Sequence, residues 1–150
     1  MPVLDLTDMP RGAPLIGLDL GTKTIGVAAS DALWMIASSL ETISRSKFTQ
    51  DIARVFKLME SRAALGIVIG LPVNMDGTEG PRAQSTRAFA RHTLRIRDLP
   101  IAFWDERLSS AAVNRMMISE LDLTRVRRGE LVDKLAAAYI LQGALDRLRG

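Results

Sequence analysis

The sequence predicts an α/β fold in which a mixed β-sheet is flanked by helices. Two short apolar segments, residues 14–20 and 24–30, are joined by a glycine-containing turn and are typical of a β-hairpin. The wholly apolar, β-branched segment 65–71 is typical of a central strand that is buried on both faces. Helical spacing and strand segments alternate in the second half of the chain, as expected when helices cover a sheet.

The N-terminal half is predicted to hold a leader, three antiparallel strands and one helix. Two prolines and a glycine interrupt residues 1–13, which we expect to form a flexible leader. A third, shorter strand within residues 35–43 would complete a meander with the hairpin. Apolar residues at helical spacing then predict a helix over residues 51–64, which Gly66 would end.

The second half is predicted to alternate helices and strands after a polar loop. Pro81 is well placed at the first position of a helix because its fixed φ suits a helix start. The expected elements are a helix over 81–97, a strand over 99–104, a helix over 109–120, a basic connector over 121–129 and a helix over 130–148. Residues 14–150 are therefore predicted to form a single domain.

Composition excludes several classes of protein. The chain has 150 residues with no cysteine, so neither disulfides nor thiolate metal ligands are possible. No apolar run approaches the ~20 residues of a membrane span, and the N-terminus does not resemble a secretion signal. We therefore expect a cytoplasmic protein without a membrane partner. The net charge of +3 permits nucleic-acid binding without requiring it.

Four acidic residues stand out because they lie on, or directly after, apolar segments. Asp19 is the one charged residue of the first strand, where an uncompensated carboxylate would cost free energy. Asp105 and Glu106 end a later strand, and at most one of them shares a face with Asp19 because neighbouring side chains alternate. Asp133 begins an apolar stripe of the last helix. Convergence of these segments would create an oxygen-rich site for Mg²⁺ or Mn²⁺ and would suit phosphodiester hydrolysis.

These acids also have structural explanations. Asp19 could cap the adjacent turn or form a buried salt bridge. Asp133 could be a first-turn acid, which the helix dipole favours by a few tenths to ~1 kcal/mol. The one histidine, His92, lies among arginines on a predicted helix, so a Ser–His triad is not expected.

Four blocks follow one another along the chain, at residues 17–28, 70–79, 105–109 and 133–137. In that order they resemble the YqgF/RuvX family, bacterial proteins described as Holliday junction resolvases and as nucleases that mature the 16S rRNA precursor. The resemblance implies a ribonuclease H-like fold in which carboxylates from the first strand, a later strand and the last helix bind magnesium. It implies catalytic roles for Asp19, for Asp105 or Glu106, and for Asp133. We favour Glu106 as the ligand for its longer reach.

Substrate contacts require cations near the acids, since nucleic acid is a polyanion. Arginines recurring along the helix over 81–97 would form either a binding ridge or a solvated stripe. The polar loop belongs to one of the family-like blocks, which places it near the substrate. The candidate substrate-binding residues are Lys23, Asn74, Arg107, Arg125, Arg127 and Arg128.

The function expected from the resemblance is metal-dependent endonuclease cleavage of structured nucleic acid, in processing of the 16S rRNA precursor. The first alternative is a Holliday junction resolvase that cuts branched DNA. A symmetric homodimer rather than a monomer would favour that alternative, because two equivalent cuts need two sites. A non-catalytic nucleic-acid binding module is a further alternative. An actin-like phosphotransferase shares the Asp-x-Gly-Thr motif but needs two such domains, more than 150 residues supply.

Overall fold

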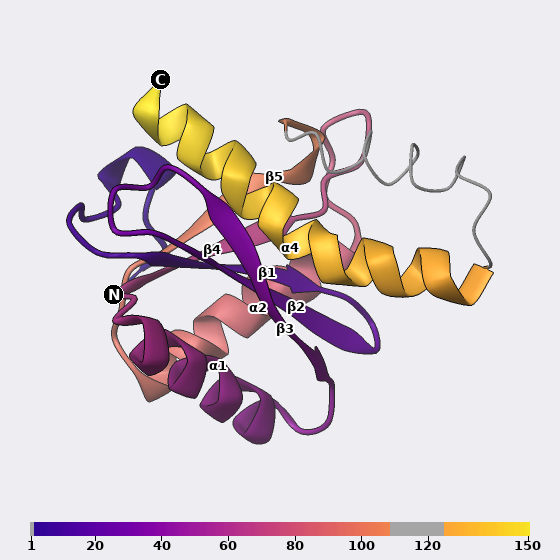
Figure 1. Ribbon diagram of the computed structural model, residues 1–150. Coiled ribbons are helices and arrows are strands. Elements are labelled where there is room, and N and C mark those ends of the chain that lie inside the picture. Colours follow the sequence, from indigo (N-terminus) through magenta and orange to yellow (C-terminus); the bar gives the residue numbers. More distant parts are fainter. Residues whose placement is uncertain (1, 109–124) are drawn as a thin grey trace.

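A five-stranded mixed sheet forms the centre of the molecule, with helix α4 on one face and helices α1 and α2 on the other (Figure 1). This computed structural model describes residues 2–108 and 125–150, and the side chains of residues 2–108 and 135–150. The helix expected over residues 109–120 lies outside the described residues.

The order of elements follows the sequence prediction. Strands β1, β2 and β3 form an antiparallel meander, whereas β4 pairs in parallel with β1 and with β5, which gives the sheet order β3-β2-β1-β4-β5. The predicted mixed α/β sheet is therefore confirmed. The elements are β1 (Leu15–Leu20), β2 (Thr24–Ser30), β3 (Ala37–Ser44), α1 (Phe48–Arg62), β4 (Gly66–Leu71), α2 (Pro81–Ile96), β5 (Ile101–Asp105) and α4 (Arg125–Arg149).

The two faces of the sheet bury separate apolar clusters. Alternation along β4 sends Ile67 and Ile69 to the cluster under α1 and α2, and Val68 to the cluster under α4. Every residue of β4 is buried, as predicted for a strand covered on both sides. On α4, Ala137 and Ile140 are fully buried, which confirms the apolar stripe predicted for the last helix.

The N-terminal residues differ from the flexible leader expected. Leu4 forms an isolated parallel bridge with Ala102 of β5, and its N–H donates to the carbonyl of Ile101 at 2.8 Å. Leu6 and Met9 are buried in the cluster under α4. This stretch therefore packs against the sheet, and its apolar side chains hold it there.

We expect Leu6→Ala to destabilise the protein by about 2 kcal/mol, the lower end of the range for truncation of a buried leucine. Leu6 is 9% exposed at the rim of its cluster, so part of the resulting space can fill with solvent. Urea unfolding followed by circular dichroism would measure the loss. An exposed leucine at another site, Leu33→Ala, is the control, and an equal, near-zero effect in both variants would contradict the packing of this segment.

Three helix boundaries also differ from the sequence prediction by more than one residue. Helix α1 begins at Phe48 rather than at residue 51. Helix α1 ends before Gly66 because Ala63 adopts the left-handed conformation (φ 55°), and Gly66 instead begins β4. Helix α4 begins at Arg125, so Arg125, Arg127 and Arg128 belong to its first turns rather than to a connector. Within the described ranges, no helix has the length and apolar character needed to cross a membrane.

Candidate active site

Asp19 lies near the end of β1 on the face covered by α4. The face follows from Gly17, where a Cβ would stand 2.7 Å from the Cβ of Leu141 and 3.2 Å from the carbonyl oxygen of Ala137, both in α4. Side chains two residues apart on a strand share a face, so Asp19 points to the same side as that missing Cβ. The residue is partly exposed, as expected near the open end of the strand.

Glu106 reaches the same face from the end of β5. Its Oε1 stands 2.8 Å from the position that a Cβ would occupy on Gly70 of β4. The paired register of β1 and β4 ends at Leu18 with Ile69, so the next residues along the two strands are Asp19 and Gly70. Adjacent strands lie roughly 4.8 Å apart. The carboxylate of Glu106 therefore lies over the strand next to the one that carries Asp19.

Asp105 faces away from this pair. Trp104 belongs to the cluster under α4, so its neighbour Asp105 points to the opposite face. The Arg107 Nη2 donates to Asp105 Oδ2 at 2.8 Å, and the Arg107 N–H donates to Oδ1 at 2.9 Å. The side-chain bond from Arg107 lowers the pKa of the Asp105 carboxyl and outweighs the opposing effect of partial burial. Of the two neighbouring acids, Glu106 is the one that shares a face with Asp19.

This ion pair predicts a small pH dependence of stability. Because the pKa of Asp105 is lowered in the folded protein, its contribution is present above the ordinary carboxyl pKa and disappears as the pH falls through the lowered value. We expect Arg107→Gln to lose at most about 1 kcal/mol near neutral pH, since the pair is partly exposed. The difference between variant and wild type should vanish in strong acid. Urea midpoints measured across this pH range would test it, and a difference that grows with acid would contradict it.

Asp133 lies in α4, one helical turn before Ala137. The Ala137 carbonyl is the group that stands beside Gly17 of β1, so this turn of the helix belongs to the face that carries Asp19. The side chain of Asp133 lies outside the described residues, as do those of Arg125, Arg127 and Arg128.

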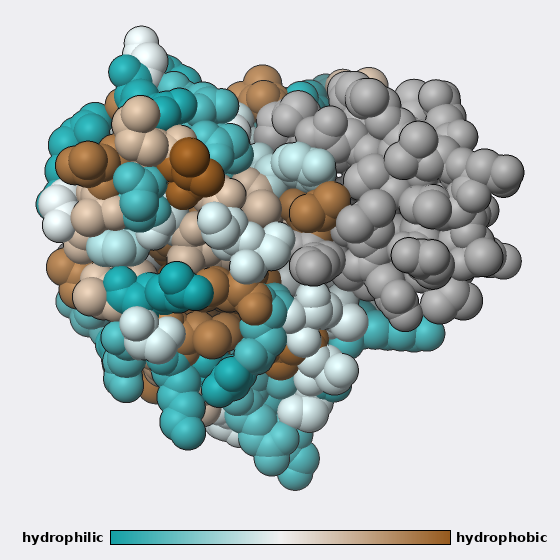
Figure 2. Space-filling view, viewed as in Figure 1, coloured by the Kyte–Doolittle hydropathy of each residue, from teal (hydrophilic) through white to brown (hydrophobic). Residues whose placement is uncertain are grey.

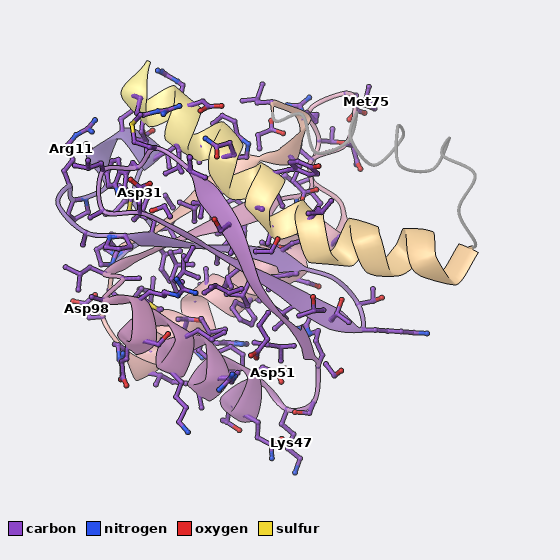
Figure 3. All side chains as sticks on the ribbon, viewed as in Figure 1. Arg11, Asp31, Lys47, Asp51, Met75 and Asp98 are labelled. Atoms are coloured by element: carbon purple, nitrogen blue, oxygen red, sulfur yellow. The ribbon has the colours of Figure 1, made fainter. Side chains whose placement is uncertain are left out.

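The loop between β4 and α2 borders the site. Asn74 closes it through two bonds to Thr78, from Asn74 N to the Thr78 carbonyl at 2.9 Å and from Nδ2 to Oγ1 at 3.0 Å. The Thr78 side chain and N–H lower the pKa of Asp76, whose carboxylate accepts both. Arg107 Nη1 donates to the carbonyl of Met75 at 3.4 Å, which ties the loop to the end of β5. Met75 itself projects from the loop, as labelled in Figure 3.

Asn74 and Lys23 are both exposed at the edge of the sheet where β1 and β4 end. Lys23 belongs to the β1–β2 turn, four residues beyond Asp19. The side chain of Asn74 serves to hold its own loop together. Of the residues that the sequence analysis proposed, the structure places five at one edge of the sheet, and Asp105 faces the other side. The five are Lys23, Asn74, Arg107, Asp19 and Glu106.

The two carboxylates fit a hard divalent cation. Carboxylate oxygens are the ligands that Mg²⁺ and Mn²⁺ prefer, and Asp19 and Glu106 present them from neighbouring positions. Gly70 leaves the space that the Glu106 side chain fills, because a Cβ there would stand 2.6 Å from Ile140 Cδ1 and 2.8 Å from the carboxylate. Among the described side chains, which do not include that of Asp133, no three acids or histidines lie close enough together to hold a metal ion.

Gly70 is the residue that reasoning from the sequence missed. The available signal was a glycine in an otherwise bulky, fully buried strand, because such a glycine often marks the close approach of another group.

Comparison with protein families gives one match over nearly the whole chain. The family model described as "RuvX: Holliday junction resolvase" matches residues 13–147. A protein of Phenylobacterium zucineum is 68% identical over 154 residues and covers 99% of each chain. One of Rhodospirillum rubrum is 59% identical over 152 residues, or 99% of this chain and 94% of its own. Both carry the name "Putative pre-16S rRNA nuclease".

Solved structures share the fold at low sequence identity. RuvC of Thermus thermophilus in complex with a Holliday junction substrate aligns with a TM-score of 0.54 at 15% identity, covering 91% of this chain and 96% of its own. Another structure of RuvC from Thermus thermophilus gives a TM-score of 0.51 at 14% identity, with the same coverage. The likeness confirms the predicted ribonuclease H-like fold.

Proposed function

This chain belongs to the RuvX family, and we propose that it is a metal-dependent endonuclease that processes the precursor of 16S rRNA in the cytoplasm. The observation that carries the proposal is the placement of Asp19 and Glu106 on one face of the sheet, with the Glu106 carboxylate over Gly70. The names of the close relatives supply the substrate class.

Asp19, Glu106 and Asp133 would hold Mg²⁺ or Mn²⁺ between the sheet edge and α4. Such an ion, when bound, activates water for attack on a phosphodiester and stabilises the leaving oxygen. The protein would contribute by holding the three carboxylates in place. Asp19 lies on a paired strand, Glu106 fills the space left by Gly70, and Asp133 lies on a helix packed against Gly17. A site fixed in this way needs little rearrangement when the substrate arrives.

Exposed basic and polar groups around the acids would hold the polyanionic substrate. Lys23 lies at the turn after β1, and Arg107 and Asn74 lie at the ends of β5 and β4. The first turns of α4 add three more cations to the element that carries Asp133. We assign substrate contacts to Lys23, Asn74, Arg107, Arg125, Arg127 and Arg128.

The test is cleavage of a 16S rRNA precursor end and of a synthetic four-way DNA junction, each with magnesium and with a chelator. We expect the purified wild type to cut the rRNA in magnesium alone. Asp133→Asn should be inactive, whereas Asp146→Asn, the same change at an exposed position near the other end of α4, should remain active. Cleavage that persists in Asp133→Asn or in chelator would contradict the proposal and indicate a contaminating nuclease.

A second candidate is the resolution of four-way DNA junctions, which the description of the family model favours. Paired, symmetric cuts would require two copies of the site. Cleavage of the junction but not of the rRNA, together with a dimer in light scattering, would replace the first proposal by this one.

A further inference from the structure

A hollow of about 180 Å³ lies beside the active-site edge, where the β1–β2 turn, the β3–α1 loop and the first turn of α2 meet. Gly21 and Thr22 form one wall, Arg45 another, and Pro81 and Arg82 the third. A second hollow of about 430 Å³ shares three of these residues. It extends the first hollow over the turn, past Lys23.

Both hollows carry positive charge. Arg45, Arg82 and Lys23 line them, and none of the lining residues is an aspartate or a glutamate. The Arg45 Nη1 donates to the Gly21 carbonyl at 2.7 Å, and the Arg82 Nη2 donates to the Leu20 carbonyl at 3.4 Å. The carbonyls of Leu20 and Gly21 therefore hold the two guanidinium groups in place. Among the described residues neither arginine forms an ion pair, so no carboxylate neutralises their charges.

The chemistry of the hollow fits a phosphate group. Guanidinium groups bind phosphate oxygens through paired hydrogen bonds, and Ser85 and Thr22 add hydroxyls to the lining. The volume of about 180 Å³ is below the roughly 300–1,000 Å³ of pockets that enclose a drug-sized ligand. A single phosphate therefore fits the smaller hollow.

The hollow lies at the end of β1, across the β1–β2 turn from the face that carries Asp19. It begins at Leu20, the residue after Asp19, but Leu20 packs against the cluster under α1 and α2 whereas Asp19 faces α4. A nucleic-acid strand with its scissile phosphate at Asp19 would cross the β1–β2 turn and bring a neighbouring phosphate into the hollow. We propose that Arg45 and Arg82 form a subsite for a non-scissile phosphate of the substrate strand. This subsite rests on the proposed nuclease function.

The test is binding of a fluorescent RNA that contains a 16S precursor end, without magnesium, at salt concentrations from about 50 to 200 mM. Arg45→Gln and Arg82→Gln should each weaken binding about tenfold and reduce the slope of log affinity against log salt by about 1. Arg62→Gln removes the same charge from an exposed position at the end of α1, before β4 begins, and should change the affinity less than twofold.

Ser85→Glu provides an independent variant, because it introduces a carboxylate into the hollow and leaves both arginines in place. We expect the same loss of affinity, with a melting temperature close to that of the wild type. RNA binding by all three pocket variants that equals that of Arg62→Gln would overturn the subsite. Arginine-dependent binding of inorganic phosphate without any effect on RNA would overturn it as well.

The nuclease proposal can fail separately. In magnesium, the pocket variants should raise KM for RNA cleavage about tenfold and leave kcat within twofold, because the subsite holds a phosphate that does not react. If the wild type cuts no substrate yet the pocket variants still bind RNA tenfold more weakly, Arg45 and Arg82 hold a phosphate of bound RNA and the nuclease assignment falls.

Discussion

Glu106→Gln is expected to lower the rate of magnesium-dependent cleavage at least about 1,000-fold while RNA binding is retained. Glutamine keeps the shape of the side chain beside Gly70 but removes the charge that a divalent cation requires. Metal ions contribute several kcal/mol of transition-state stabilisation, and every 1.36 kcal/mol is a factor of ten in rate. Single-turnover cleavage of the rRNA precursor end would measure the loss.

The neighbouring variant Asp105→Asn is the matched control. Asp105 lies on the other face of the sheet in an ion pair with Arg107, so its loss should slow cleavage less than tenfold. Asp19→Asn should instead behave like Glu106→Gln, and the two losses together should not add, because either one disables the same cation site. A larger loss from Asp105→Asn than from Glu106→Gln would reverse the assignment of the ligand.

Gly17→Ala is expected to destabilise the protein by about 3 kcal/mol, although it adds a single methyl group. The new Cβ would stand 2.7 Å from Leu141 Cβ and 3.2 Å from the Ala137 carbonyl oxygen. Both atoms are part of, or directly attached to, the backbone of α4, so neither can move unless the helix moves. Urea unfolding would give the change in free energy.

Gly80→Ala is the control for that measurement. A Cβ at Gly80 would have Asn74 Nδ2 as its nearest neighbour at 3.6 Å, an ordinary contact. Gly80 is the N-cap of α2, where alanine is less favourable than glycine, so the expected loss is about 1 kcal/mol or less. Equal stability of the two variants would show that α4 does not pack against β1 as closely as the structure has it. Because α4 also carries Asp133, Gly17→Ala should lower cleavage too.

The parts of the fold that are strongly patterned could be predicted from the sequence. The apolar segment that forms β4 was predicted to be buried on both faces, and it is. The apolar stripe of the last helix correctly predicted which side of that helix is buried. Boundaries were harder. Nothing in the sequence shows that Ala63 adopts φ 55° and ends α1, because a left-handed residue at a helix end is usually a glycine. The burial of Leu6 and Met9 depends on tertiary contacts in the same way.

The candidate site could be predicted only up to the choice of face. Because side chains alternate along a strand, only one of Asp105 and Glu106 could share a face with Asp19 and bind the same metal ion. The point at which β5 ends, which decides between them, cannot be read from the sequence. In the structure β5 ends at Asp105. Because Trp104 faces α4, Asp105 faces the opposite side and Glu106 returns to the α4 side. The hollow beside the turn was missed because Arg45 and Arg82 are 37 positions apart in the chain (82 minus 45) and meet only through folding. Lys23, which lines the larger hollow together with Arg82, was the sole residue of this group that the sequence indicated.

The bridge between Leu4 and Ala102 covers part of the backbone of β5. β5 is the outermost strand on its side of the sheet, and an uncovered outermost strand invites a strand of another molecule to pair with it. On the face viewed in Figure 2, polar and apolar residues are interspersed. A chain shortened to begin after Met9 would lose this cover and should form oligomers as its concentration rises, even with every catalytic residue in place.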